Sequence, residues 1–291
     1  MGNNLTLPRA MSLTLLVCGF VVPWLSEPMH ALARTKARTI QTEHYEIRTD
    51  LEPSLADDLA KRLEAMHSEY ARRLALFSTN NVAAQHKVVL MNRPDDVRRL
   101  TGMSAGAAGE FQPANNLLAA FLEGQGREEL RKTLQHEGFH QFAHAAISKN
   151  IPLWLNEGLA VYFEEGIWTG DGFLPGQVPP HRIRTLKDAL DNGRLIPFQK
   201  LMKISHEEWE SNMVNDEELS AIQYNQSWAM VYFLVHGSNG NDVFRTRLIR
   251  MLQLLHDGQS GNEAFTAAFS ANVDGFYHRF LEYLAGLHPT P

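Results

Sequence analysis

The chain has 291 residues, of which 44% are hydrophobic and 21% are charged. This composition suits a folded domain with a sizeable core and excludes disordered and fibrous proteins. The formal net charge is −6, the isoelectric point is near 6.1, and no segment concentrates lysine or arginine on one helical face. A nucleic-acid-binding protein is therefore not expected.

The N-terminus has the features of an export signal. A short segment carrying Arg9 precedes about 15 apolar residues, Met11 to Leu25, and Ala31-Leu32-Ala33 supplies the pattern of small residues at which such signals are cleaved. We therefore predict a signal peptide over residues 1–33. The expected location is secreted or periplasmic.

An uncleaved membrane anchor is the alternative for the same segment. Its apolar stretch is interrupted by Pro23 and is shorter than the roughly 20 residues that a spanning helix needs. With cleavage, the mature chain is a single domain over residues 34–291, without stable membrane insertion. The only cysteine, Cys18, lies in the leader, so no disulfide is expected.

After the leader, the first half of the chain predicts strands and one long helix. The alternation of Ile40, Tyr45 and Ile47 predicts a strand that ends near Asp50. Pro53 suits the first turn of a helix, and apolar residues recur at helical spacing as far as Phe77. Two further strands are expected, over residues 86–92 and 115–124.

The second half of the chain is predicted to be mostly helical. Helical patterns cover residues 127–148 and the apolar run 151–164, a Gly/Pro-rich loop follows over 166–180, and helices continue from His181 to the end. No linker separates independent domains. We expect an α+β fold with two lobes in one domain, over residues 34–165 and 166–291.

The segment HEGFH predicts a metal site on the first of these helices. His136 and His140 are four residues apart, so both imidazoles leave the same helical face one turn apart, as two ligands of one zinc ion require. Glu137 projects about 100° around the helix axis from His136. It can reach a zinc-bound water without being a ligand, as in H-E-x-x-H metallopeptidases.

Glu157 is the candidate for the third ligand. A catalytic zinc site needs three protein ligands and an open fourth position. Glu157 stands in an apolar run between Leu155 and Leu159, where a buried carboxylate is costly unless it bonds to a positive partner. We therefore predict one zinc ion per chain, bound by His136, His140 and Glu157.

These motifs resemble the gluzincin metallopeptidases. HEGFH followed by WLNEGLAVYFE is especially similar to the aminopeptidase-type branch, and the layout from Thr39 to Leu287 is similar to small bacterial peptidase-MA-like proteins. The resemblance implies a zincin-like fold: a small N-terminal sheet with a long helix, a central HExxH helix and a helical C-terminal lobe. It also implies that His136, His140 and Glu157 bind zinc and that Glu137 is the general base.

Tyr224 is a further match to this family. Relatives carry a tyrosine on a helix well after the third ligand, which helps to stabilise the oxyanion, and Tyr224 opens the helical pattern YNQSWAMVYFLVHG at a plausible distance. A tyrosine packed at a helix start is the alternative. Two features depart from relatives. The G-A-M-E-N segment of the aminopeptidases is absent, and Val161 stands where thermolysin-like enzymes have an aspartate.

The sequence thus predicts an exported zinc peptidase acting on a peptide or protein substrate. The zinc activates a water, Glu137 transfers its proton, and a donor such as Tyr224 stabilises the oxyanion. Two alternatives stay open: a peptidase-fold binding protein without turnover, and a zinc hydrolase of a non-peptide substrate. Neither the choice between endo- and exopeptidase nor the oligomeric state follows from these residues.

Overall fold

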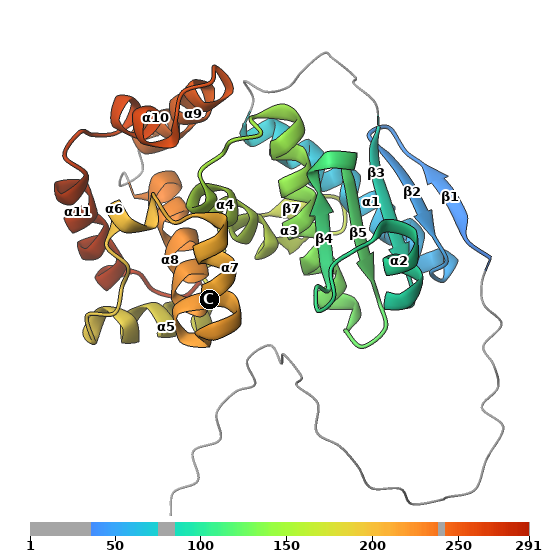
Figure 1. Ribbon diagram of the computed structural model, residues 1–291. Helices are drawn as coiled ribbons and strands as arrows, with labels where there is room; N and C mark the ends of the chain where they lie inside the picture. The colour runs from blue at the N-terminus through green and yellow to red at the C-terminus, as the bar shows by residue number, and fades with distance from the viewer. Residues whose placement is uncertain (1–35, 75–84, 238–241, 291) are drawn as a thin grey trace, which may run out of the picture.

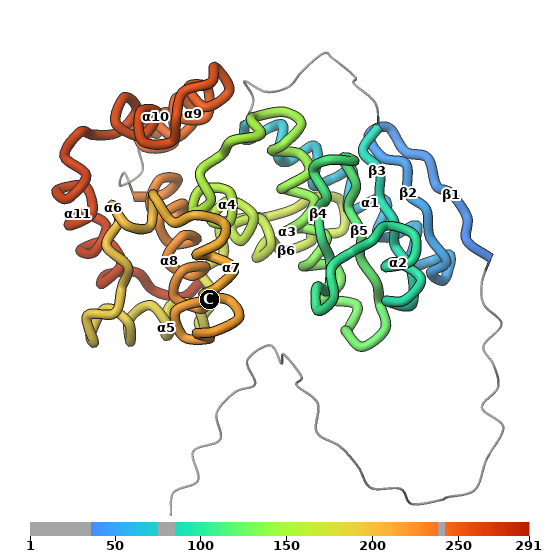
Figure 2. The backbone as a smooth tube through the Cα atoms, in the orientation of Figure 1, coloured from blue at the N-terminus to red at the C-terminus, as the bar shows by residue number. Residues whose placement is uncertain are grey.

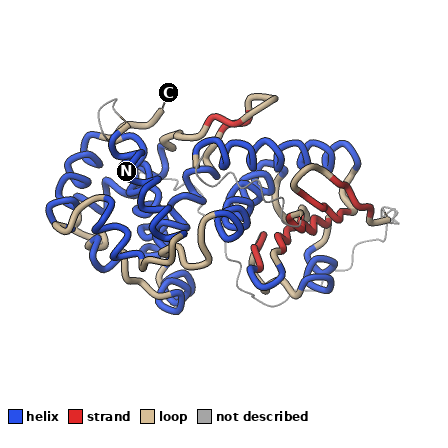
Figure 3. The backbone as a smooth tube through the Cα atoms, turned by 90° about the horizontal axis from the view of Figure 1, so that it is seen from above, coloured by secondary structure: helices blue, strands red, loops and turns tan. Residues whose placement is uncertain are grey.

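A computed structural model describes residues 36–74, 85–237 and 242–290 (Figure 1). The chain has an α+β fold in which the sheet is formed by the first third of the described residues and the later part is helical. Seen from above, most of the strands gather at one end of the molecule and helices form the other end (Figure 3). The predicted fold class is confirmed.

The main sheet has five strands. The middle three strands run parallel, and each edge strand runs antiparallel to its neighbour. In spatial order the strands are β1 (Arg38–Gln41), β2 (Tyr45–Thr49), β3 (His86–Met91), β5 (Leu117–Phe121) and β4 (Gly109–Gln112).

The strand predicted to end near Asp50 is in fact a hairpin. Ile40 in β1 pairs with Ile47 in β2, and hydrogen bonds between Thr42 and Tyr45 close the turn between the strands. The apolar residues do lie in strands, as predicted, but Ile40 belongs to the first strand and Tyr45 and Ile47 belong to the second. Local pattern alone does not distinguish one strand from two in this segment.

The sheet is covered on both faces. On one face, α1 (Pro53–Arg73) packs against β2 and α3 (Arg127–Ala146). Glu52 caps α1 by accepting hydrogen bonds from the backbone amides of Ser54 and Leu55. The predicted apolar stripe of α1 is buried, whereas Phe77 lies outside the described residues. The buried stripe includes Leu55, Leu59, Leu63, Met66 and Tyr70.

In the first half of the chain, helix α2 (Pro94–Thr101) and strand β4 were not predicted. Helix α2 covers the other face of the sheet, where Val97 packs with a small cluster of buried residues, and Gly102, at φ 71°, ends the helix in the left-handed conformation. Strand β4 (Gly109–Gln112) forms at the end of the Gly-rich segment of residues 101–111. Both elements are short and carry few buried apolar residues, so their sequence patterns are weak.

The zinc motif lies on α3, and the second predicted helix is α4 (Leu153–Glu164). Helix α3 ends two residues earlier than the predicted Ser148. Helix α4 is buried along most of its length, because it packs against α3 on one side and α8 (Glu217–His236) on the other. The tube in Figure 2 shows α3 and α4 at the middle of the molecule, and α8 packs beside α4.

The remaining elements follow α4 in the chain. The loop predicted over residues 166–180 contains a short hairpin of two strands, β6 (Ile167–Trp168) and β7 (Phe173–Leu174). The helices are α5 (Pro180–Asp191), α6 (Phe198–Leu201), α7 (His206–Asn215), α9 (Val243–His256), α10 (Gly261–Ala268) and α11 (Val273–Gly286). Helix α8 packs against α5, α7, α9 and α11.

One hydrophobic core joins the sheet and the helices. It runs from Tyr45 in β2 to Leu284 in α11 and includes the apolar side chains of α3, α4 and α8. Within the described residues, no helix is both long and apolar enough to cross a bilayer. The predicted signal peptide lies outside the described residues, and the predicted lobe boundary at residue 165 stays a prediction.

A glycine permits the close contact between α4 and α8. A Cβ atom at Gly158 would lie 2.4 Å from the backbone oxygen of Ser227 and 2.7 Å from the side chain of Val231. Because backbone atoms of α8 cannot move independently, any larger side chain forces the two helices apart. Gly158 follows Glu157 directly in α4, so this close contact also fixes the position of Glu157 relative to α8.

We expect Gly158→Ala to lower the free energy of unfolding by about 1–3 kcal/mol, the usual cost of overpacking a core. Chemical denaturation of the variant and the parent protein measures the difference. Gly286→Ala is the matched control, because a Cβ there meets nothing within 4 Å. A Gly158→Ala protein as stable as the parent would mean that the two helices can separate freely.

Candidate metal centre

Three predicted ligands converge between α3 and α4. The Nε2 atom of His136 lies 3.3 Å from Oε2 of Glu157, and Nε2 of His140 lies 3.5 Å from Oε1 of the same carboxylate. One ligand atom from each of the three residues lies within 4.8 Å of the others. The two imidazole rings are nearly perpendicular, at 81°, so their nitrogen atoms approach one point from different directions.

The packing of α3 on α4 creates this convergence. Phe139, between the two histidines in sequence, stacks on Phe163 of α4 at a centroid distance of 5.3 Å. The side-chain amide of Gln135 donates hydrogen bonds to the carbonyls of Phe163, Glu164 and Gly166. These bonds satisfy carbonyls at and just after the C-terminal end of α4. They attach this end of α4 to α3 at Gln135, the residue before His136.

Glu164 is a site residue that sequence analysis missed. Its Oε2 lies 2.9 Å from Nδ1 of His136, so the carboxylate accepts a hydrogen bond from Nδ1–H and leaves Nε2, which faces Glu157, as the candidate ligand atom. Glu164 is seven residues after Glu157, which places both carboxylates on the same face of α4. That spacing was the signal that could have identified it.

The second histidine is held differently. Nδ1 of His140 is buried and has no hydrogen-bond partner among the described residues. The ring is therefore oriented by its helix, by packing and by Glu157. Among the residues that the structure describes, a carboxylate bonds to Nδ1 of His136 but none bonds to Nδ1 of His140.

Charge interactions among these side chains hold the group together. Burial opposes the ionisation of Glu157, but the charge of His140 and hydrogen bonds to both histidines keep the pKa of this carboxyl far below its ordinary value. Burial lowers the pKa of His136, but hydrogen bonds to Glu157 and Glu164 outweigh it and raise that pKa well above the ordinary value. The pKa of His140 is also raised, because the charge of Glu157 outweighs burial.

The donor set fits a zinc ion. Zinc bonds of about 2.0–2.2 Å to nitrogen and oxygen separate the ligand atoms of a tetrahedral site by about 3.3–3.5 Å. One oxygen of Glu157 lies 3.3 Å from His136 and the other lies 3.5 Å from His140, and one ligand atom from each residue lies within 4.8 Å of the others, so the three side chains surround a space of the size that a zinc ion needs. Two neutral imidazoles and one carboxylate also form a donor set that leaves a fourth position open.

The structure places Glu137 beside the edge of the sheet. Its Oε2 accepts a hydrogen bond of 2.9 Å from the backbone amide of Phe111 in β4. The side chain is half-buried, and its charge acts on the pKa values of both His140 and Tyr224. Glu137 is thus near the group without being a member of it, as its position on the helix predicts.

Tyr224 lies in the interior of α8, because this helix begins at Glu217 and not at Tyr224. The hydroxyl donates a hydrogen bond to the sulfur of Met213 at 3.3 Å, and the ring packs edge-on against Trp209. Burial raises the pKa of the hydroxyl, and the charge of Glu157 raises it further. The hydroxyl of Tyr224 is therefore close enough to Glu157 to interact with its charge, and the side chain also packs against α7.

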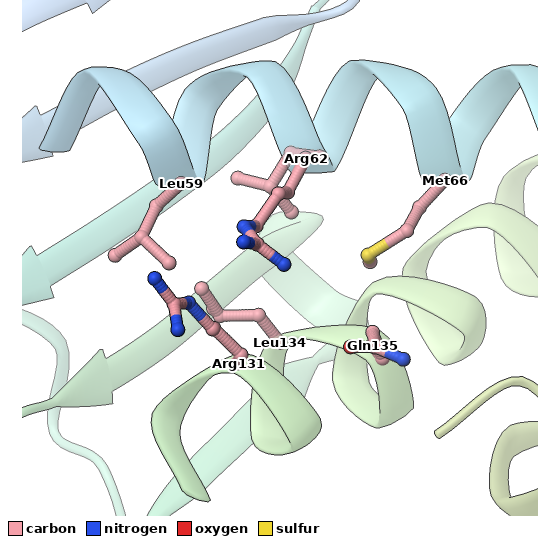
Figure 4. A pocket seen from close by; sticks show the side chains of 7 residues that line it. Leu59, Arg62, Met66, Arg131, Leu134 and Gln135 are labelled. Atoms are coloured by element: carbon pink, nitrogen blue, oxygen red, sulfur yellow. The ribbon is translucent and has the colours of Figure 1, made fainter. Parts of the chain in front are cut away.

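A small pocket elsewhere does not belong to this site. It lies between α1 and α3, and its lining includes none of the three candidate ligands (Figure 4). Side chains of these two helices alone line it, so it is a gap in their packing. The residues that line it are Leu59, Arg62, Leu63, Met66, Arg131, Leu134 and Gln135.

The fold and the site together define a gluzincin-like metallopeptidase family. The chain belongs to the peptidase MA superfamily, whose family model matches residues 113–286. The matched region contains every candidate site residue named above except Phe111 and begins after β4. A comparison with curated proteins finds no match.

Metal binding should depend on pH in a defined direction. A histidine ligand must be neutral, and the pKa values of His136 and His140 are raised in the metal-free protein. Binding at neutral pH should therefore release about one proton or more, and affinity should rise as the pH rises through the raised pKa values. Calorimetric titration in buffers of different ionisation enthalpy measures both effects. A pH-independent affinity without proton release would contradict this assignment.

Proposed function

We propose that this protein is an exported zinc-dependent peptidase. The observation that carries the proposal is the buried group of His136, His140 and Glu157, with Glu137 one position along the same helix. His136, His140 and Glu157 would hold the zinc ion. When bound, the zinc supplies a Lewis acid that polarises a carbonyl and makes water nucleophilic near neutral pH.

Glu137 is the proposed general base. Its carboxylate takes a proton from the attacking water and passes it to the leaving amine. The Phe111 amide of β4 donates to one carboxylate oxygen, so it orients the group and leaves the other oxygen for the water. Tyr224 is the proposed donor to the developing oxyanion, provided that its hydroxyl leaves Met213.

The position of β4 supports a peptide substrate. β4 is an edge of the sheet and pairs with β5 on one side only. The amide of Phe111 points to the other side, towards Glu137. An extended peptide can add to such an edge through backbone hydrogen bonds, which would bring its carbonyls beside Glu137.

Export is part of the proposal and rests on the leader-like residues 1–33. No stable membrane insertion of the mature chain is proposed. The substrate is a peptide or protein, without a role for nucleic acid. One zinc ion per chain is proposed.

The function is tested by Glu137→Gln and His140→Ala. Purified mature protein should contain about one zinc per chain and cleave members of an unbiased peptide library, read by mass spectrometry. Glu137→Gln should keep the zinc and lose about 100- to 10,000-fold in kcat, because an amide cannot accept the proton. His140→Ala should lose both zinc and activity.

Two outcomes would contradict the proposal. Equal turnover by Glu137→Gln would remove this residue from the mechanism. Full zinc occupancy without cleavage of any library peptide by the parent protein would favour a binding protein or a non-peptide substrate.

Tyr224→Phe tests the proposed oxyanion donor. Loss of one such donor should lower kcat by about 10- to 1,000-fold with little change in KM, because the hydrogen bond forms in the transition state. Zinc content and thermal stability should stay nearly the same. If the hydroxyl serves only its bond to Met213, stability falls by about 1 kcal/mol and kcat per folded molecule is unchanged. Met213→Leu is the matched control for that contact.

A further inference from the structure

A buried arginine lies behind the candidate metal centre and has no part in the proposed mechanism. Arg182, in α5, has 9% of its surface exposed, although arginine is rarely buried. Every guanidinium nitrogen has a partner. Nε donates to Oε1 of Glu165 at 2.7 Å, Nη1 to Oδ1 of Asn225 at 2.7 Å, and Nη2 to Oε1 of Glu164 at 3.3 Å.

The contacts of Arg182 lead directly to a candidate ligand. Glu164 uses its two oxygens for different partners: Oε1 bonds to Arg182 and Oε2 bonds to Nδ1 of His136. Its side chain is therefore fixed from both ends. The orientation of the His136 ring depends on where Glu164 is held.

The positive charge of Arg182 also reduces the repulsion between two adjacent carboxylates, Glu164 and Glu165. Glu164 and Glu165 are consecutive, both have side chains that are mostly buried, and their like charges repel. Lys132 bonds to Glu165 but not to Glu164, and its side chain is 48% exposed. Without Arg182, Glu164 would keep its bond to His136 but lose the bond to Oε1, and repulsion from Glu165 would favour other rotamers of Glu164.

We propose that Arg182 is a positioning residue for the metal centre, which holds Glu164 and, through it, the ring of His136. The inference rests on the proposed function, because it assigns His136 to a zinc ion. The same guanidinium bonds to Asn225, the residue after Tyr224 in α8. Arg182 thus connects α4, which carries the third ligand, with α8, which carries the proposed oxyanion donor.

The chemistry of the site requires arginine. A planar guanidinium can donate in three directions at once, whereas a lysine ammonium on a flexible chain is a single point charge. Arg182→Lys keeps the positive charge but cannot reach Glu164, Glu165 and Asn225 together. This conservative variant therefore separates geometry from charge.

Zinc affinity and the Co²⁺ spectrum test the proposal without depending on turnover. Competition with a chromophoric chelator gives the zinc dissociation constant, and Co²⁺ substitution reports ligand geometry through its visible absorption. We expect Arg182→Lys to weaken zinc binding by about 10- to 100-fold, the usual effect of disturbing a group that orients a ligand. Its Co²⁺ spectrum should differ from that of the parent protein. Near-ultraviolet circular dichroism confirms that the variant is folded.

A double-mutant cycle tests the route through Glu164. If Arg182 acts on His136 through Glu164, then Arg182→Lys should have little further effect on zinc affinity in a Glu164→Gln background. Arg182→Gln provides a second variant of the arginine should the first be poorly folded. A full, independent effect of either substitution in the Glu164→Gln background would overturn the proposed route.

Arg62→Lys is the matched control. Its side chain is 13% exposed, close to the 11% of Arg182, and it bonds to Asp58 and lies over the ring of Trp168, away from the three ligands. Its zinc affinity and Co²⁺ spectrum should equal those of the parent protein. A folded Arg182→Lys protein that equals the parent in both measurements would overturn the inference. A parent protein that binds no zinc would instead refute the proposed function.

Discussion

The burial of one carboxylate between two imidazoles is the constraint around which the middle of the molecule is arranged. Glu157 has 9% of its surface exposed and faces His136 and His140 across the contact of α3 with α4. A carboxylate in this position is unfavourable unless cationic or metal partners surround it. The close approach of α4 to α8 at Gly158, which follows Glu157, makes the position of the carboxylate rigid.

Further charged side chains are buried behind the carboxylate of Glu157 and its two histidines. Glu164 orients the ring of His136. The positive charge of Arg182 lies between the negative charges of Glu164 and Glu165, and its guanidinium also bonds to Asn225. The result is a hydrogen-bonded network that joins α3, α4, α5 and α8 behind the candidate centre. Such a network stabilises the site only while every member is paired, so its members depend on one another.

The sheet contributes to the site through its edge. Glu137 lies where α3 faces β4, and the backbone amide of Phe111 holds its carboxylate. The region matched by the peptidase MA family model begins after this strand. The contact nevertheless joins the N-terminal sheet to the proposed chemistry, because β4 is paired through β5 to the rest of the sheet.

The sequence by itself determined the α+β class, the long helices and the spacing of His136 and His140, because helical periodicity depends on near neighbours. It also indicated Glu157, since an acidic residue in an apolar run needs a buried partner. Only the tertiary structure decided that Glu164 and Arg182 support His136 and that β4 holds Glu137. These contacts join residues 18 to 28 positions apart through the packing of helices on one another and on β4. The spacing of Glu157 and Glu164 places both carboxylates on one face of α4, but it does not say which side chain Glu164 contacts.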